Sequence, residues 1–268
     1  MSSENPKKIT AEDIDCFIGC RHESGVKYST IHKDLSNLRK FLRFFNNDAV
    51  DKFKDKYPDH VPKRYHKRGP SMEEDTIQKI LRRASEINVY NWELMEAYGI
   101  VTLAICTGFR PKELRMLSFS NTNVSDDGIE IYAEHVKGER SYGQARWVTV
   151  HPDGVPIILK YLEARHIKLE AAKKNADAFF PPIKHNGDYI SYSRVTVLKS
   201  MVEEDLGIKF DLRKCRRTFG QRAINEGQAI HDVSLVMGHA SIATTQREYA
   251  DKEQHQASRD MKKFWDAH

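Results

Sequence analysis

The stretch LVMGHASIATTQREYA, residues 235–250, places His239 directly after a glycine and ten residues before Tyr249. A tyrosine hydroxyl has an unperturbed pKa of about 10, so it needs neighbouring cations before it can act as a nucleophile. Taken alone, Tyr249 is an ordinary amphipathic tyrosine. The choice between these two interpretations depends on which cations the rest of the chain supplies.

A first cation stands in CTGFRPKELRML, residues 106–117, where Arg110 follows a glycine turn and precedes an apolar helix. Glu113 lies one helical turn further on and can brace the guanidinium group. An arginine fixed at a helix start can grip a phosphate through two parallel hydrogen bonds. The alternative is a surface Arg-Glu pair of little energetic consequence.

Two more segments supply cations. EHVKGERSYG, residues 134–143, places Lys137 at the turn of a predicted hairpin, where an ammonium group could protonate a departing 5′ oxygen. Lysine is also ordinary in a polar turn.

The other segment, DLRKCRRTFGQRA at residues 211–223, spaces Arg213 and Arg216 three residues apart. Both then point to one helix face and can meet a phosphate, although a solvated basic face is the alternative.

The order of these pieces resembles the tyrosine recombinase family, which includes phage integrases and Xer-type resolvases. The resemblance covers residues 71–268 and is carried by TGFRPKEL, RTFGQ and MGHASIATTQ together. It implies a catalytic set with Tyr249 as nucleophile and Glu113 as supporting acid. The other catalytic residues that it implies are Arg110, Lys137, Arg216 and His239.

The chain departs from the family pattern at two positions. Arg213 stands where the family usually has a histidine. An arginine stays protonated, so it cannot be a general base, but it can still neutralise a phosphate; we therefore keep Arg213 in the catalytic set. Tyr249 also comes one residue later after the glycine-histidine pair than the family spacing, and no other tyrosine follows His239.

The resemblance implies an enzyme that cleaves and rejoins duplex DNA through a 3′-phosphotyrosine intermediate, for integration, excision or resolution. It implies no cofactor and no metal, because arginines take the metal's role. The implied partners are double-stranded DNA and, on DNA, a homo-tetramer formed from a free monomer. Two alternatives remain: a type IB topoisomerase-like DNA-relaxing enzyme, and a non-cleaving DNA-binding protein on the same fold.

The fold class predicted is mainly α with a small β-sheet or hairpin, in two domains. In residues 28–46, Ile31, Leu35, Leu38, Leu42 and Phe45 recur at helical spacing, with Ser29 or Thr30 as N-cap. Residues 57–70 hold three prolines, a glycine and a basic run, which indicates a linker. We therefore expect a helical domain at 1–68 and a catalytic domain at 69–268.

The resemblance extends the domain prediction. Residues 1–68 look like the family's helical, SAM-like core-binding domain, and the two domains would close as a C-shaped clamp around DNA. Further helices are expected at 11–20, 71–86 (opened by a Ser71–Glu74 capping box), 93–107, 154–173, 193–206, 213–226, 231–237, 241–248 and, as a C-terminal assembly helix, 252–266, with strands at 129–134 and 146–151.

The basic charge is concentrated at one end. The net charge is +5 and the pI about 8.9, and residues 1–70 hold 15 Lys and Arg against 10 Asp and Glu. This distribution indicates a polyanionic partner. The DNA-contacting residues predicted in this segment are Lys33, Arg39, Lys40, Arg43, Lys63, Arg64, Lys67 and Arg68, and the basic run at residues 213–217 adds Lys214 and Arg217.

Cysteine usage and hydropathy favour a cytoplasmic protein that associates with the nucleoid when bound to DNA. No apolar run approaches the roughly 20 residues that cross a bilayer, so no membrane contact is expected, and the four cysteines form no disulfide framework. Cys16 and Cys20, with His22 nearby, could be imagined as a metal site. No second matching pair follows, so packing of the two thiols within a helix is the favoured interpretation.

Overall fold

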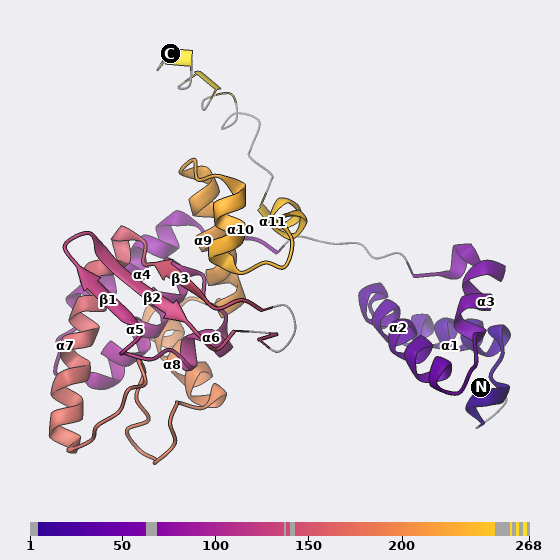
Figure 1. Ribbon diagram of the computed structural model, residues 1–268, viewed down its shortest axis with the longest axis horizontal. Coiled ribbons are helices and arrows are strands. Elements are labelled where there is room, and N and C mark those ends of the chain that lie inside the picture. The colour runs from indigo at the N-terminus through magenta and orange to yellow at the C-terminus, as the bar shows by residue number, and fades with distance from the viewer. Residues whose placement is uncertain are drawn as a thin grey trace. The chain divides into compact units, whose positions relative to one another are not determined.

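The computed structural model describes residues 5–62, 69–136, 138–139 and 143–249, together with positions 258, 261–262 and 265–266. Side chains are described as far as residue 246, and again at those five positions. The chain divides into two compact units, Met1–Arg68 and Gly69–His268 (Figure 1). The predicted site residues Lys137, Lys63, Arg64, Lys67 and Arg68, and the side chain of Tyr249, lie outside the described part.

The first unit is helical. It consists of η1 (Pro6–Lys8), α1 (Ala11–Glu23), α2 (Tyr28–Phe44), α3 (Ala49–Lys56) and η2 (Pro58–His60). The predicted apolar face of α2 is confirmed for four of its five residues: Ile31, Leu35 and Leu42 are buried, and Leu38 packs half-buried against the same core. The fifth, Phe45, is the C-cap residue after the helix and contacts the rings of Phe41 and Phe44. Most of the stability of a helix in a protein comes from packing of its apolar face, so burial of that face against α1 and α3 stabilises α2.

Three predictions for this unit are wrong. The N-cap of α2 is Lys27, because the helix already begins at Tyr28. Val61 packs against the helical core, so the segment after α3 belongs partly to this unit and the connection is shorter than 57–70. Cys16 and Cys20 are both exposed, because α1 turns Ile14 and Ile18 inward instead.

The second unit is built around α5 (Trp92–Thr107). Every residue from Met95 to Thr107 is buried, as expected of a helix that is apolar on all sides. The helices α4 (Glu74–Glu86), α7 (Val155–Ala172), α8 (Tyr192–Leu206) and α9 (Leu212–Asn225) pack on it. The one carboxylate in its buried stretch, Glu96, forms an ion pair with Arg194.

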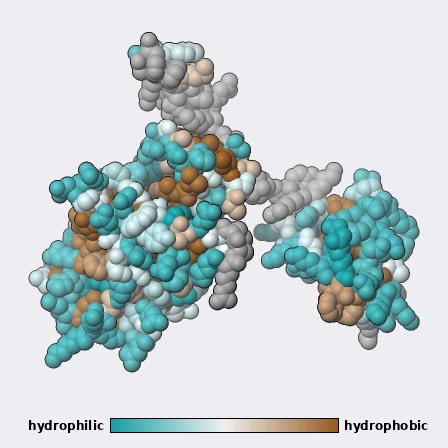
Figure 2. Space-filling view, in the orientation of Figure 1, coloured by the Kyte–Doolittle hydropathy of each residue, from teal (hydrophilic) through white to brown (hydrophobic). Residues whose placement is uncertain are grey.

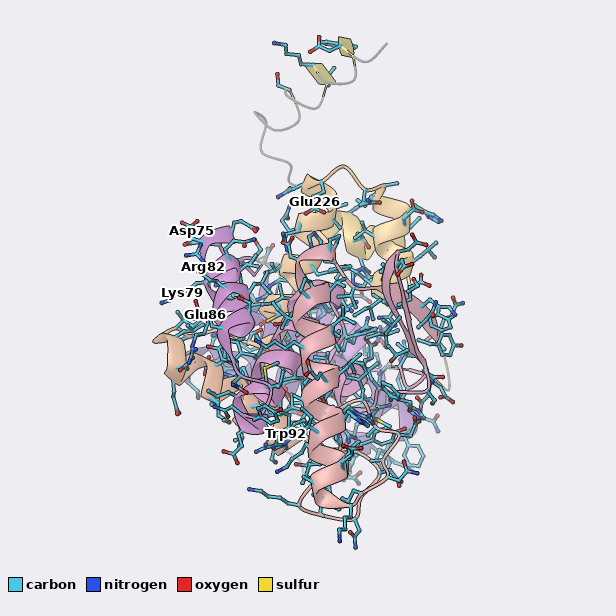
Figure 3. The ribbon with its side chains drawn as sticks, turned by 90° about the vertical axis from the view of Figure 1, so that its left-hand side faces the viewer. Asp75, Lys79, Arg82, Glu86, Trp92 and Glu226 are labelled. Atoms are coloured by element: carbon cyan, nitrogen blue, oxygen red, sulfur yellow. The ribbon has the colours of Figure 1, made fainter. Side chains whose placement is uncertain are left out.

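Helix α4 faces the core with one side only. Ile77, Ile80, Leu81 and Ala84 are buried, and its outer face carries Asp75, Lys79, Arg82 and Glu86 (Figure 3). This alternation of charges at helical spacing is typical of a solvated face.

The start predicted for α4 is wrong. The helix begins at Glu74, and its N-cap Glu73 makes no side-chain cap hydrogen bond. The backbone N–H of Met72 instead donates to Thr218 Oγ1 at 2.8 Å. A tertiary contact with α9 thus holds the residues of the expected capping box outside the helix.

A small antiparallel sheet lies beside the helices. Its strands are β1 (Thr122–Ser125), β2 (Gly128–Ala133) and β3 (Arg146–Thr149), in the order β1-β2-β3. Both predicted strands are present, but β1 was not predicted, because it lacks a clear alternation of apolar and polar residues. In β3 the side chains alternate, so Arg146 and Val148 face inward while Trp147 faces solvent.

Four short elements complete the described part of the unit: α6 (Pro111–Arg115), η3 (Pro152–Gly154), α10 (Ile230–Met237) and α11 (Ile242–Tyr249). Together with α9, the helices α10 and α11 form a subassembly with its own small core. Apolar surface is visible over α10 and α11 in Figure 2, where Leu235 and Ile242 are exposed. In the part of the chain that the structure describes, no helix has the length and apolar character to cross a bilayer.

Candidate functional site

Four of the predicted site residues, Arg110, Glu113, Arg216 and His239, lie together at the C-terminal end of α10. Arg110 is the N-cap residue of α6 (Pro111–Arg115), and Arg216 lies in α9. Each donates a hydrogen bond to one of the two backbone carbonyls before His239: Arg110 Nη2 to Gly238 O at 2.9 Å, and Arg216 Nη2 to Met237 O. The C-terminal end of a helix carries partial negative charge, so it favours cations there.

Glu113 braces Arg110 as the sequence predicts. Its Oε1 accepts from Arg110 Nη1 at 2.7 Å and its Oε2 accepts from the Arg110 backbone N–H at 2.9 Å. The Glu113 side chain is fully buried, whereas about a quarter of the Arg110 side chain (24%) stays exposed. The guanidinium group is therefore held by the buried carboxylate, while part of the side chain stays accessible to solvent.

Arg216 is the more buried of the two arginines. Its Nη1 donates to Gly108 O at 2.6 Å, and the residue is 8% exposed. Gly108 adopts a left-handed conformation (φ 65°) as the C-cap of α5, which a glycine does at no steric cost. Through this carbonyl, Arg216 joins the end of the central helix to the end of α10.

Sequence reasoning missed a third arginine at this place. Arg146 Nε donates to Val236 O at 2.5 Å, and its Nη2 donates to Glu113 Oε2 at 3.0 Å. Three guanidinium groups therefore occupy three consecutive carbonyls, those of residues 236, 237 and 238. The available signal was the alternation in β3, which turns Arg146 to the buried face.

His239 is neutral in this surrounding. Burial lowers the pKa of His239, and the nearby Arg216, Arg110 and Arg146 lower it further, to about 3. Its Nδ1 lies 2.7 Å from Thr245 Oγ1, which is fully buried in α11. A neutral imidazole beside three fixed cations can donate or accept a hydrogen bond without adding charge.

At Glu113, burial and the neighbouring arginines have opposite effects on the pKa. Burial alone would raise the pKa of Glu113, but the charges of Arg146 and then Arg110 outweigh burial and hold it below its usual value. The site thus contains one carboxylate and three guanidinium groups. This excess of positive charge suits a phosphate, whose developing negative charge preorganised donors stabilise best.

The structure places the nucleophile candidate only by its backbone. Tyr249 is the last residue of α11, a helix that packs on α9 and α10. The same helix contributes Thr245 to His239. The position of the Tyr249 side chain and that of Lys137 stay predictions.

The three other cations of α9 that the sequence analysis singled out have different surroundings. Arg213 is exposed one turn before the buried Arg216, and Lys214 is half-buried. Arg217 Nε donates to Pro70 O at 3.2 Å, so this side chain holds the segment that enters the second unit. Direct DNA contact by Arg217 stays a prediction that this hydrogen bond does not favour.

The predicted basic face of α2 is divided in a similar way. Lys33 and Lys40 are exposed. Arg39 and Arg43 instead form ion pairs with Asp51 of α3, at 2.5 Å and 3.0 Å. The two lysines are therefore the free cations on this helix among the four named.

Within the described residues, no group of three or more His, Cys, Asp or Glu side chains is arranged to hold a metal ion. Cys16 and Cys20 lie on the exposed side of α1. The site chemistry above consists of arginines, a carboxylate and a histidine.

Comparison with known proteins gives a consistent picture. The model of the phage integrase family matches residues 70–256. Tyrosine recombinase XerC of Bacillus pumilus (strain SAFR-032) is 25% identical over 242 residues, covering 90% of this chain and 76% of the relative. Tyrosine recombinase XerD of Rickettsia prowazekii (strain Madrid E) is 24% identical over 246 residues, covering 89% and 77%.

Solved structures share the fold at lower identity. The integrase of transposon Tn1549 in complex with transposon right end DNA superposes with a TM-score of 0.66 at 18% identity, covering 98% of this chain and 87% of that one. The XerH site-specific recombinase bound to a palindromic difH substrate gives 0.69 at 15% identity, covering 97% and 72%.

Proposed function

The chain belongs to the phage integrase family, and from that premise we propose how its own residues carry out site-specific recombination of DNA. The enzyme breaks and rejoins DNA strands, as its tyrosine recombinase relatives indicate. The observation that carries the proposed mechanism is the row of three guanidinium groups on the carbonyls that precede His239.

In the proposed reaction the Tyr249 hydroxyl loses its proton to solvent, and its oxygen attacks the scissile phosphate. A tyrosine–phosphate bond forms, the bond to the 5′ oxygen breaks, and the leaving oxygen takes a proton from Lys137. The product is a 3′-phosphotyrosine with a free 5′-hydroxyl. Because the ester keeps the energy of the phosphodiester, a 5′-hydroxyl from another strand can reverse the step and rejoin the DNA.

The arginines and His239 hold the phosphate. Arg110 and Arg216 stabilise the charge that develops on the non-bridging oxygens, with Glu113 fixing Arg110. His239 donates one hydrogen bond from its neutral imidazole, and the exposed Arg213 adds positive charge from the adjacent turn of α9. The depressed pKa of His239 and the burial of Glu113 support these roles.

We also propose that both units contact the same duplex, as a clamp. The helical unit would supply Lys33 and Lys40 from the exposed side of α2, and the basic segment 63–68 would cross the DNA backbone. Lysine contacts with phosphates provide sequence-independent affinity that falls with salt. The DNA complexes of the Tn1549 integrase and XerH support DNA as the partner.

A tetramer on two DNA sites is the proposed assembly. The tail residues Met261 and Trp265 are 53% and 65% exposed, and Leu235 and Ile242 are exposed on α10 and α11. Apolar groups left on the surface in this way mark sites of protein association. A tail that packs on the neighbouring protomer would couple one site to the next around a closed ring.

The mechanism is tested by Tyr249→Phe. DNA bound by the protein is first selected from a random duplex library, and the selected site is built as a suicide substrate with a nick beside the cleavage position. The wild type should form a covalent protein–DNA adduct. Tyr249→Phe should bind the same DNA without forming one, because phenylalanine has no nucleophilic oxygen.

The control is Tyr90→Phe, which changes a tyrosine that is 77% exposed before the far end of α5. It should form the adduct like the wild type. An adduct that persists in Tyr249→Phe would overturn the assignment of the nucleophile. Relaxation of supercoiled DNA without strand exchange between two sites would favour the topoisomerase-like alternative.

A further inference from the structure

Arg146 connects three elements of the second unit, β3, α6 and α10. It stands first in β3, it hydrogen-bonds Glu113 of α6, and it hydrogen-bonds the Val236 carbonyl of α10. We infer that Arg146 is a positioning residue of the proposed reaction: it holds Glu113 and the end of α10 so that Arg110 and His239 face one phosphate. This inference rests on the proposed function.

The shared carboxylate is the first support. Glu113 Oε2 accepts from the Arg110 backbone N–H and from Arg146 Nη2, while Oε1 accepts from Arg110 Nη1. Because the Glu113 side chain is fully buried, its charge is stable only while both arginines stay in place. Without Arg146 the carboxylate would rotate or take up a proton, and the Arg110 guanidinium would lose its fixed orientation.

The fit of Arg146 against Gly238 is the second support. Gly238 ends α10 with φ 62°, and a Cβ added there would lie 2.9 Å from Arg146 Cζ and from Nη1. The missing side chain thus makes the space in which the guanidinium lies flat against the backbone beside His239. A glycine at this position serves the left-handed turn and the arginine together.

The third support is the burial of the Arg146 guanidinium group. Its side chain is 10% exposed, and within the described residues its Nη1 is buried and has no hydrogen-bond acceptor. An uncompensated donor costs about 1–3 kcal/mol, so a role in stability alone explains this arrangement poorly.

A lysine cannot replace this group. The two acceptors, Val236 O and Glu113 Oε2, lie on different elements and receive Nε and Nη2 of one planar fork. An ammonium group keeps the charge but not the fork. The variant Arg146→Lys therefore separates charge from geometry, and Arg146→Gln removes the charge as well.

The test measures single-turnover cleavage of the nicked suicide substrate at saturating protein, together with half-site affinity and thermal stability. Arg146→Lys and Arg146→Gln should cleave about tenfold to a hundredfold more slowly, the scale of a displaced catalytic group. Binding of the half-site should stay near that of the wild type. Equal loss of affinity and cleavage would overturn the inference.

Arg165→Lys is the matched control. Arg165 is 6% exposed and also donates to backbone carbonyls, those of Ala176, Ala178 and Phe179, away from the site. It should lower the melting temperature without slowing cleavage below that temperature. If Arg146→Lys behaves in the same way, its role is structural and the inference is wrong.

A second substrate distinguishes the positioning role of Arg146 from the proton-donating role of Lys137. A 5′-bridging phosphorothioate leaves without protonation, so it should rescue Lys137→Ala. It should not rescue Arg146→Lys, because the defect there lies in the phosphate clamp. Rescue of Arg146→Lys would show that it acts through Lys137 and would overturn the inference. Absence of any adduct in the wild type would instead refute the proposed function itself.

Discussion

Arg213 and Arg216 show how differently two arginines one turn apart can be used. Arg216 is buried and fixed by two carbonyls, whereas Arg213 is exposed and keeps its charge at the surface. Arg213→His should stay active, since a histidine can still hydrogen-bond a phosphate. Arg213→Glu should slow cleavage by about tenfold or more, because reversing a charge near a phosphate costs on the order of a kcal/mol or more at a protein surface.

The control for Arg213→Glu is Lys184→Glu. Lys184 is 84% exposed and lies 4.0 Å from Glu93, at the other end of a 16-residue helix from Arg110, which is about 24 Å long. This charge reversal should leave the cleavage rate unchanged. Full activity in Arg213→Glu would show that the side chain points away from DNA.

His239 predicts a pH dependence of stability. The pKa of His239 is lowered to about 3 in the folded protein, while an unfolded histidine has about 6.5. Between these values the unfolded chain binds a proton that the folded one does not, so this group lowers the free energy of unfolding as the pH falls from 6.5 towards 3. Above pH 6.5 it has no such effect.

Urea unfolding of the wild type and of His239→Asn between pH 7.5 and pH 4 measures this contribution. The wild type should lose more stability over that range than the variant, because asparagine takes up no proton. A difference between the two that does not change with pH would mean that the pKa of His239 is the same in the folded and the unfolded protein.

At the scale of single elements, the C-terminal turn of α10 is where a substitution should lower stability and cleavage most. Gly238 and Gly207 both end helices in the left-handed conformation, at φ 62° and φ 64°. A Cβ at Gly207 would meet nothing within 4 Å, whereas at Gly238 it would meet the guanidinium of Arg146. Gly207→Ala should therefore cost only the strain of this conformation, about 1–2 kcal/mol.

Gly238→Ala should cost more than Gly207→Ala and should also slow cleavage, since the arginine must move away from Glu113 and Val236. Denaturant unfolding and single-turnover cleavage of the two variants provide the comparison. Equal stability losses with unchanged cleavage in both would show that Arg146 shifts freely and does not position the site.

At the scale of the whole molecule, the prediction concerns the C-terminal tail, residues 254–268, and assembly on DNA. Residues 258, 261–262 and 265–266 are helical and exposed, and an isolated short helix is marginal in water. Truncation after residue 253 should therefore spare the binding of one protomer to a half-site but abolish dimeric and tetrameric complexes and strand exchange. Native gel electrophoresis on one-site and two-site DNA measures both. Recombination at the full rate by the truncated protein would exclude the tail as the assembly element.

Element types were predictable where periodicity is strong. The central helix is apolar over most of its length, and α2 repeats its apolar residues at helical spacing, so both follow from the sequence. The edge strand β1 and the start of α4 do not. The edge strand has no alternating pattern, and the residues before α4 are held by Thr218, a contact between positions 146 residues apart.

The sequence by itself determined the chemistry of this protein. The types and order of Arg110, Arg216, His239 and Tyr249, and the i, i+3 position of Glu113, are properties of the chain that hold before it folds. Local spacing sets which side chains share a helix turn, so the Arg110–Glu113 contact could be predicted and is confirmed at 2.7 Å.

Only the tertiary structure decided how that chemistry is held. Val236, Met237 and Gly238 accept from arginines 90, 21 and 128 residues away, and no local pattern encodes such pairings. They arise because buried carbonyls and a buried carboxylate must find donors when α6, α9, α10 and β3 meet. Motif analysis of the sequence therefore did not identify Arg146. It becomes part of the site only when the folded chain brings these four elements together.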